Sequence, residues 1–155
     1  MKLQEEILKI KNEMIDEFDK RVEALKEEEQ EFPQDGDEYW SISETGEIIG
    51  DKWDSLDFEK YMLEIGNVFK TKQQAEFAIE KLKVEAELRK FSQPFDYENR
   101  NWVILWSNFE KNIQIKWSAG TVRQGSIYFE SKEKAEEAVK SVGEDRIKKY
   151  IFGVE

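Results

Sequence analysis

The side chains that could do acid–base or metal chemistry in this sequence are carboxylates, because histidine and cysteine are both absent. The missing imidazole removes the usual general base, the serine and cysteine triads and the nitrogen ligands of zinc. Aspartates spaced by three residues occur at Asp51, Asp54 and Asp57, and Asp35 lies two residues before Asp37. Neither spacing matches an EF-hand loop, so a solvated acidic loop explains them better than a cation site. We therefore predict a protein that is not an enzyme and holds no metal or cofactor.

The net charge of −11 is concentrated in one central segment. Residues 31–64 hold 11 acidic and 2 basic residues, a net charge of −9, whereas residues 65–155 carry a net charge of +2. Bulk nucleic-acid binding needs cations that release phosphate counterions, so this balance argues against it. Solubility explains most of an acidic balance. The five central aspartates and one outward tryptophan, Trp106, are our candidate residues for binding a partner protein.

Tryptophans offer a different kind of site, because aromatic platforms stack the bases of single strands. Three of the five tryptophans lie near basic residues in the second half of the chain. These tryptophans are Trp102, Trp106 and Trp117, and the basic residues are Arg100, Lys116 and Arg123. Tryptophans on strands usually pack against helices, and we favour that interpretation for most of them.

A segment that occurs twice organises the rest of the chain. Residues 66–82 have the sequence GNVFKTKQQAEFAIEKL, and residues 125–142 have the sequence GSIYFESKEKAEEAVKSV. Each copy predicts a short strand of β-branched or aromatic residues, then a helix N-cap at Thr71 or Ser131. An amphipathic helix with alanines on its inner face follows each cap. Gly143 suits the end of the second helix.

A hairpin is predicted before each copy, at residues 39–49 and 101–117. The fold class is therefore α+β, with a long N-terminal helix followed by two tandem β-β-β-α units with antiparallel sheet. The globular domain spans residues 39–155, and its two repeats are residues 39–93 and 100–155. The pattern leaves open whether the two halves form one continuous sheet or two lobes.

Residues 1–31 predict one amphipathic, coiled-coil-like helix, and residues 32–38 predict an acidic linker. Apolar residues recur along the helix with an eleven-residue period, which favours a straight or slightly right-handed pairing. Such a helix is not stable without burial, so it must pair with a second copy or lie across the globular part. We favour self-association into a homo-oligomer. The predicted oligomerisation residues are Leu3, Ile7, Ile10, Met14, Phe18, Val22 and Leu25.

The N-terminus lacks the apolar stretch of a signal peptide, and the longest apolar run, residues 102–106, is far too short to cross a bilayer. We therefore expect a cytoplasmic protein without a membrane partner.

Three strings carry a resemblance to a known group of sequences. They are DGDEYWSI, GNVFKTKQQAEFAIEKLKVEAEL and YFESKEKAEEAVKSVGEDRIKKYIFGV. Over residues 35–155 the chain resembles a group of small, mostly uncharacterised proteins of bacteriophages and integrated elements, common in Gram-positive hosts. The resemblance implies a phage or mobile-element origin and carries over no catalytic residue. Small acidic phage proteins of that kind are often accessory factors, including inhibitors of host defence nucleases.

Three functions follow as hypotheses. The leading one is a non-enzymatic phage-type protein that binds and inhibits a host nucleic-acid enzyme, such as a CRISPR or restriction nuclease, through its acidic segment. The second is a single-stranded nucleic-acid-binding module that uses aromatic residues of the second hairpin. The third is a structural oligomer of the virion or the replication apparatus, assembled through the N-terminal helix.

Overall fold

The computed structural model describes residues 2–29 and 31–155, and it has the α+β class that the sequence predicts. A long N-terminal helix precedes two antiparallel hairpins and four further helices among the described residues. In chain order the elements are α1 (Lys2–Glu29), β1 (Glu38–Ile42), β2 (Ile48–Lys52), α2 (Asp57–Glu64), α3 (Lys72–Arg89), β3 (Asn101–Ser107), β4 (Asn112–Ser118), α4 (Lys132–Val142) and α5 (Glu144–Tyr150).

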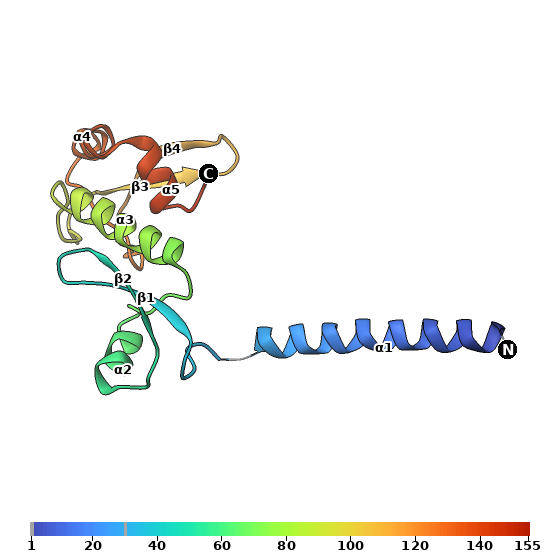
Figure 1. Ribbon diagram of the computed structural model, residues 1–155. Coiled ribbons are helices and arrows are strands. Elements are labelled where there is room, and N and C mark those ends of the chain that lie inside the picture. Colours follow the sequence, from blue (N-terminus) through green and yellow to red (C-terminus); the bar gives the residue numbers. More distant parts are fainter. Residues whose placement is uncertain (1, 30) are drawn as a thin grey trace.

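The hairpins form two separate two-stranded sheets, so the two halves do not share one continuous sheet. β1 pairs with β2 and β3 pairs with β4, each in antiparallel register. We call residues 31–89 the first lobe and residues 90–155 the second lobe. Helix α3 belongs to the first lobe in sequence, and it lies between the first hairpin and the helices of the second lobe (Figure 1).

The third strand predicted for each half is reduced to a single pair of residues. Phe69 exchanges both backbone hydrogen bonds with Trp40, at 2.8 and 2.9 Å. Phe129 does the same with Trp102, at 2.9 and 3.0 Å. In the first lobe the Asn67 side chain takes the next place in the ladder, since its amide bonds both the N–H and the C=O of Ile42 at 2.8 Å. Each half therefore has two strands and a Trp–Phe bridge, and the second half has a further bridge between Gln93 and Tyr128.

The helices after these bridges begin as predicted. The Thr71 hydroxyl accepts a hydrogen bond from the Gln74 N–H at 3.2 Å, and the Ser131 hydroxyl accepts one from the Lys134 N–H at 3.1 Å. Ala75 of α3 is fully buried, and so is its counterpart in α4. Small inner residues let each helix lie close to its sheet.

The main core lies in the second lobe and includes part of α3. Val84 and Leu88 of α3 pack with Phe129, with the inner residues of α4 and with Ile147 of α5. Ile147 has no exposed surface. Helix α3 thus joins the two lobes through its own packing.

Helix α1 projects from the rest of the molecule as a separate rod (Figure 1). Its observed C-terminal residue is Glu29, two residues before the predicted boundary, and strand β1 begins at Glu38, inside the predicted linker. Between residues 3 and 25, every side chain is exposed except the half-buried Val22.

Candidate interaction surfaces

The structure gathers the five predicted aspartates on the first lobe. Asp35 and Asp37 lie on the loop before β1, beside the segment that leaves β2, because the Gly36 N–H donates to the Trp53 carbonyl at 2.8 Å. The hydroxyl of Ser55 donates to the Asp35 carboxylate across the same junction. The remaining aspartates belong to β2, to the following loop and to the start of α2; they are Asp51, Asp54 and Asp57.

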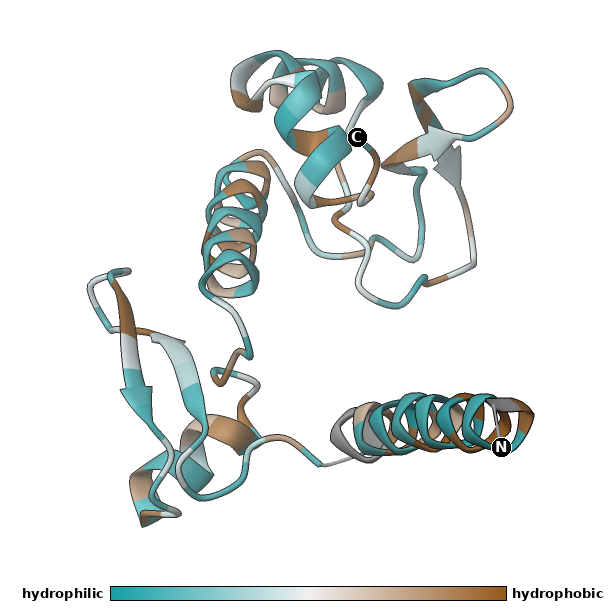
Figure 2. Cartoon of the chain, turned by 45° about the vertical axis from the view of Figure 1, so that its right-hand side comes forward, coloured by the Kyte–Doolittle hydropathy of each residue, from teal (hydrophilic) through white to brown (hydrophobic). Residues whose placement is uncertain are grey.

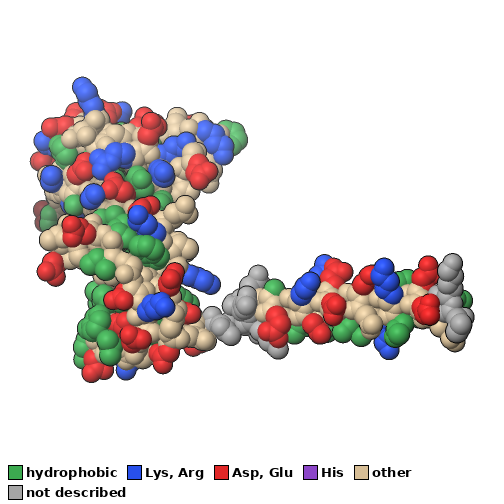
Figure 3. Space-filling model, in the orientation of Figure 1, with side chains coloured by type: hydrophobic (Ala, Val, Ile, Leu, Met, Phe, Trp, Pro, Cys, Tyr) green, Lys and Arg blue, Asp and Glu red, His purple; other side chains and the backbone are tan. Residues whose placement is uncertain are grey.

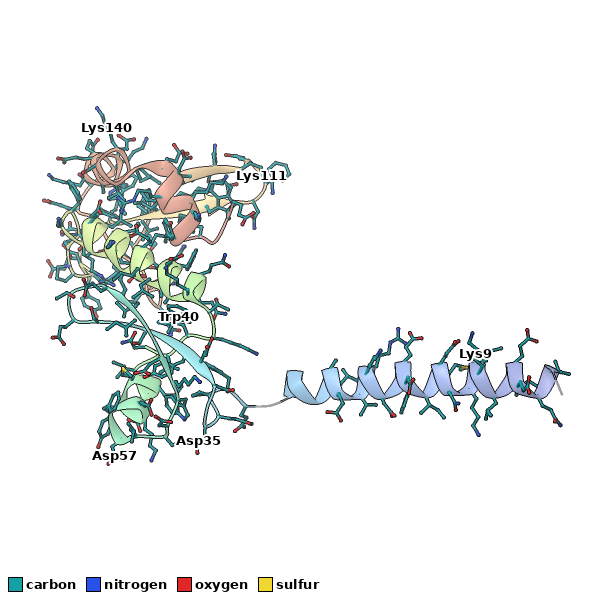
Figure 4. All side chains as sticks on the ribbon, viewed as in Figure 1. Lys9, Asp35, Trp40, Asp57, Lys111 and Lys140 are labelled. Carbon is teal, nitrogen blue, oxygen red and sulfur yellow. The ribbon has the colours of Figure 1, made fainter. Side chains whose placement is uncertain are left out.

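These carboxylates form an acidic surface, which we define as Asp35, Asp37, Asp51, Asp54 and Asp57. Four of the five are exposed and Asp37 is half-buried. Acidic side chains crowd this end of the molecule in Figure 3, and Figure 4 shows Asp35 and Asp57 at the opposite end from Lys111 and Lys140. The two cations between residues 31 and 64 are Lys52 and Lys60, and Lys60 lies 3.7 Å from Asp57. The surface therefore keeps most of its negative charge.

One carboxylate of this lobe is not on the surface. Glu59 of α2 is 1% exposed, and its carboxylate accepts hydrogen bonds from the backbone N–H groups of Leu56 at 2.8 Å and Asp54 at 3.1 Å. The Tyr39 hydroxyl also donates to it, and burial followed by the charge of Glu59 raises the pKa of Tyr39 to about 12. Glu59 thus holds α2 against the hairpin and is not available to a partner.

The acidic surface is not organised as a metal centre. In residues 2–29 and 31–155, no group of three or more Asp, Glu, His or Cys side chains is placed to hold a metal ion. The aspartates at positions 51, 54 and 57 are spread over a strand, a loop and a helix start, so their carboxylates do not converge.

Trp106, the sixth predicted partner residue, lies in the other lobe. It is half-buried on β3, its indole N–H donates to the Asn108 side chain at 2.9 Å, and the Lys148 ammonium lies 5.8 Å from its ring centre. The structure therefore does not bring Trp106 to the acidic surface. The outward tryptophan of the second hairpin is Trp117, which is 47% exposed beneath the Arg100 guanidinium at 4.4 Å.

The predicted oligomerisation stripe on α1 is exposed along the described helix. Six of its seven residues are exposed hydrophobics, and Val22 is half-buried. Two further residues, Leu8 and Ile15, are also exposed and widen the apolar face beyond the predicted stripe. Figure 2 shows this apolar side running along the rod. Residues 2–15 have no net charge, whereas residues 16–29 have a net charge of −4.

A groove on the first lobe was not predicted from the sequence. It lies between α3 and the end of β1, and apolar side chains form most of it. Its lining residues are Ile42, Ile65, Gly66, Asn67, Phe69, Ala78, Lys81, Leu82 and Glu85. Ile65 is 78% exposed and Leu82 is 55% exposed. Two apolar residues could have indicated this groove from the sequence. Leu82 lies on α3 outside its buried face, and Ile65 lies in the turn before the helix.

Comparisons with protein-family models, with characterised proteins and with solved structures find no match to this chain. Among the described residues, no helix is long and apolar enough to span a membrane.

Proposed function

We propose that this chain is a non-enzymatic, phage-type accessory protein that binds and inhibits a host nucleic-acid enzyme of the CRISPR or restriction class. The observation that supports this proposal is the gathering of exposed aspartates on one lobe, around a segment with a net charge of −9. The resemblance to small phage proteins points the same way. Such a protein would act in the cytoplasm of the host cell.

The proposed mechanism is electrostatic competition. A nuclease that binds nucleic acid presents a cationic channel, and phosphates enter it through their negative charge. Exposed carboxylates on a folded lobe can occupy that channel in place of phosphates, and complementary charge also raises the association rate. Because the aspartates are exposed, salt would screen them, and inhibition should weaken as ionic strength rises.

The test is a cleavage assay with a purified CRISPR or restriction nuclease and the triple variant Asp51→Asn, Asp54→Asn, Asp57→Asn. We expect inhibition to weaken roughly tenfold or more, because three charge contacts of modest strength are lost. Amide side chains have nearly the same shape, so the fold should be kept.

The matched control removes three charges from α4 in the second lobe, with Glu133→Gln, Glu136→Gln and Glu137→Gln. This variant has the same net charge as the triple aspartate variant and should inhibit like the wild-type chain. Equal inhibition by both variants would show that total charge matters and the first-lobe surface does not. Unchanged inhibition by the aspartate variant would remove the mechanism.

A second candidate function is single-stranded nucleic-acid binding by the second hairpin. The observation that favours it is the exposed Trp117 ring beneath the Arg100 guanidinium. A base could stack on such a ring while the cation meets the backbone. Filter binding at low salt tests it: retention lost in Trp117→Ala, with Trp106→Ala as the half-buried comparison, supports this candidate. No retention of the wild-type chain dismisses it.

We also propose that the two lobes are tandem copies of one β-β-β-α unit whose third strand has shrunk to a bridge. The matching pairs Trp40–Phe69 and Trp102–Phe129, and the caps two residues after each Phe, support this proposal. A structural role in an assembly is the third candidate, since α1 exposes an apolar face along a rod. Sedimentation of the chain with and without residues 1–30 tests that role, and an unchanged oligomeric state would reject it.

A further inference from the structure

The first-lobe groove has a counterpart in the second lobe, and the two can be compared residue by residue. The bridge residues Phe69 and Phe129 are 60 positions apart, and the same offset relates the cap residues and the buried alanines that follow. Ile42 and Ile104 correspond with an offset of 62, because each lies two positions after its bridged tryptophan.

The equivalent surface in the second lobe is closed. Phe129 is 1% exposed whereas Phe69 is half-buried, and Val142 is 3% exposed whereas Leu82 is 55% exposed. A gap of the second lobe is lined by counterparts of several groove residues, among them Ile104 and Phe129, and by Glu85 and Leu88 of α3. Residues of α5 and of the turn after it line the rest of the gap; they are Ile147, Ile151 and Phe152.

Ile147 lies on α5, and Ile151 and Phe152 follow in the turn at its C-terminal end. Nothing among the described residues of the first lobe covers the groove in the same manner, and its apolar rim is left in water.

The same chain carries an uncovered apolar helix face. Near the start of α1, apolar residues spaced by four, three and four positions lie on one side of the helix: Leu3, Ile7, Ile10 and Met14. Leu8 and Ile15 widen this side. All of these side chains are exposed.

We propose that the N-terminal half of α1 docks in the first-lobe groove of a second copy of this chain, in the place that α5 takes in the second lobe. In a two-fold dimer each copy gives its helix and receives its partner's helix. Stable interfaces bury about 1,200 Å² or more in total, so the proposed dimer uses both contacts.

The charge along α1 supports this placement. Residues 2–15 are neutral, so they can approach the acidic first lobe without repulsion, and the groove itself offers one cation, Lys81, and one anion, Glu85. Residues 16–29, with a net charge of −4, would remain outside. A parallel pair of α1 helices would instead place both acidic halves side by side, which is unfavourable.

The first experiment measures mass by sedimentation at micromolar concentrations. We expect the wild-type chain at twice the 18.5 kDa chain mass, and both Leu82→Asp and the double variant Ile7→Asp, Met14→Asp at the single mass. Val122→Asp, an exposed apolar position of the second lobe, is the matched control and should stay dimeric. An equimolar mixture of the groove variant and the helix variant keeps one intact helix and one intact groove, so heterodimers should reappear.

The second experiment uses the absence of native cysteine. Chains with cysteine at position 3, 7, 10 or 14 are mixed with an affinity-tagged chain carrying Leu82→Cys, or Val122→Cys as control, and then oxidised. Disulfides between position 82 and the helix of the other copy support the proposal.

Three outcomes overturn it. A wild-type chain of single mass excludes the dimer, and a dimer in which no disulfide joins position 82 to the helix of the other copy excludes this docking. A dimer that survives Leu82→Asp and forms disulfides between two helices would show pairing of α1 with α1. The proposal does not depend on the inhibitor function, and the cleavage assay above leaves it untouched.

Discussion

The two lobes start their main helices alike and end them differently. Each helix follows a Trp–Phe bridge, a hydroxyl cap and a buried alanine. Helix α3 then runs for 18 residues to Arg89, whereas α4 has 11 residues and stops at Val142. The residue after Val142 is Gly143, with φ of 99° and ψ of 126°, and the equivalent residue in α3 is Lys83 in mid-helix.

This one difference decides which apolar surface is buried. Because the chain turns at Gly143, α5 folds back and covers the groove of its own lobe. Because α3 continues, its Val84 and Leu88 join the core of the second lobe and its own groove stays open. A break in a helix can therefore convert a binding surface into a core, and its absence can leave that surface available.

The largest expected effect comes from opening the closed lobe. Ile147→Ala removes a fully buried side chain of α5 and should lower the free energy of unfolding by about 2–5 kcal/mol, from lost transfer energy and the cavity left behind. Urea denaturation measures it. Val122→Ala, at a position 57% exposed, is the control and should change stability by less than about 0.5 kcal/mol. Similar small losses in both variants would mean that α5 is not a structural part of the second lobe.

The next effect concerns α2, which has no helical counterpart in the second lobe, where residues 119–126 form a loop. Glu59→Ala should cost roughly 2–4 kcal/mol, because two backbone N–H groups and the Tyr39 hydroxyl lose their buried acceptor. Urea denaturation checks this too. Glu64→Ala, on the exposed side of the same helix, should have little effect. A loss in Glu59→Ala no greater than in Glu64→Ala would remove this account of α2.

A smaller effect tests the turn itself. Gly143→Ala should destabilise the chain by about 1–3 kcal/mol, since the backbone at this position is strained for any residue with a Cβ. No atom lies within 4 Å of the added methyl group, so the loss would come from the backbone and not from a clash. Gly120→Ala, in an exposed loop with φ of 74°, should lose less. Equal losses at both glycines would show that the α4–α5 turn has no special requirement.

The local signals of the sequence predicted much of this comparison. Thr71 and Ser131 cap their helices as expected, and the alternating residues of both hairpins form strands. Helix α2 was not predicted, because its pattern is inverted: Phe58 and Tyr61 are exposed, and the acidic Glu59 is buried. Only tertiary contacts determine such a helix.

Local spacing in the sequence was enough to group the aspartates, but it could not show which tryptophan is exposed, because exposure depends on tertiary contacts. The aspartates lie close in sequence and on one hairpin end, so local spacing was enough to group them. Alternation places Trp102 and Trp106 on one face of β3, but it does not show which end of that face is covered. Helix α5 packs near Trp106 and covers that end of the face, whereas Trp117 lies at the open end of the hairpin. Both outcomes depend on contacts between residues far apart in the sequence.

The finest test concerns the proton on Tyr39, which is buried before the bridged Trp40, whereas the second lobe has the buried Asn101 at that place. Burial first, and then the nearby carboxylates led by Glu59, raise its pKa to about 12 in the folded chain, against about 10 when unfolded. Its contribution to stability is therefore complete below pH of about 10 and falls as the pH rises toward about 12. Thermal unfolding across that range should show a steep loss in the wild-type chain and a shallower one in Tyr39→Phe. Tyr97→Phe, at a position 83% exposed, should follow the wild-type profile. If tyrosinate absorbance instead shows Tyr39 titrating with the exposed tyrosines, the buried Tyr39–Glu59 contact is not formed in solution, and the two lobes are more alike than the structure indicates.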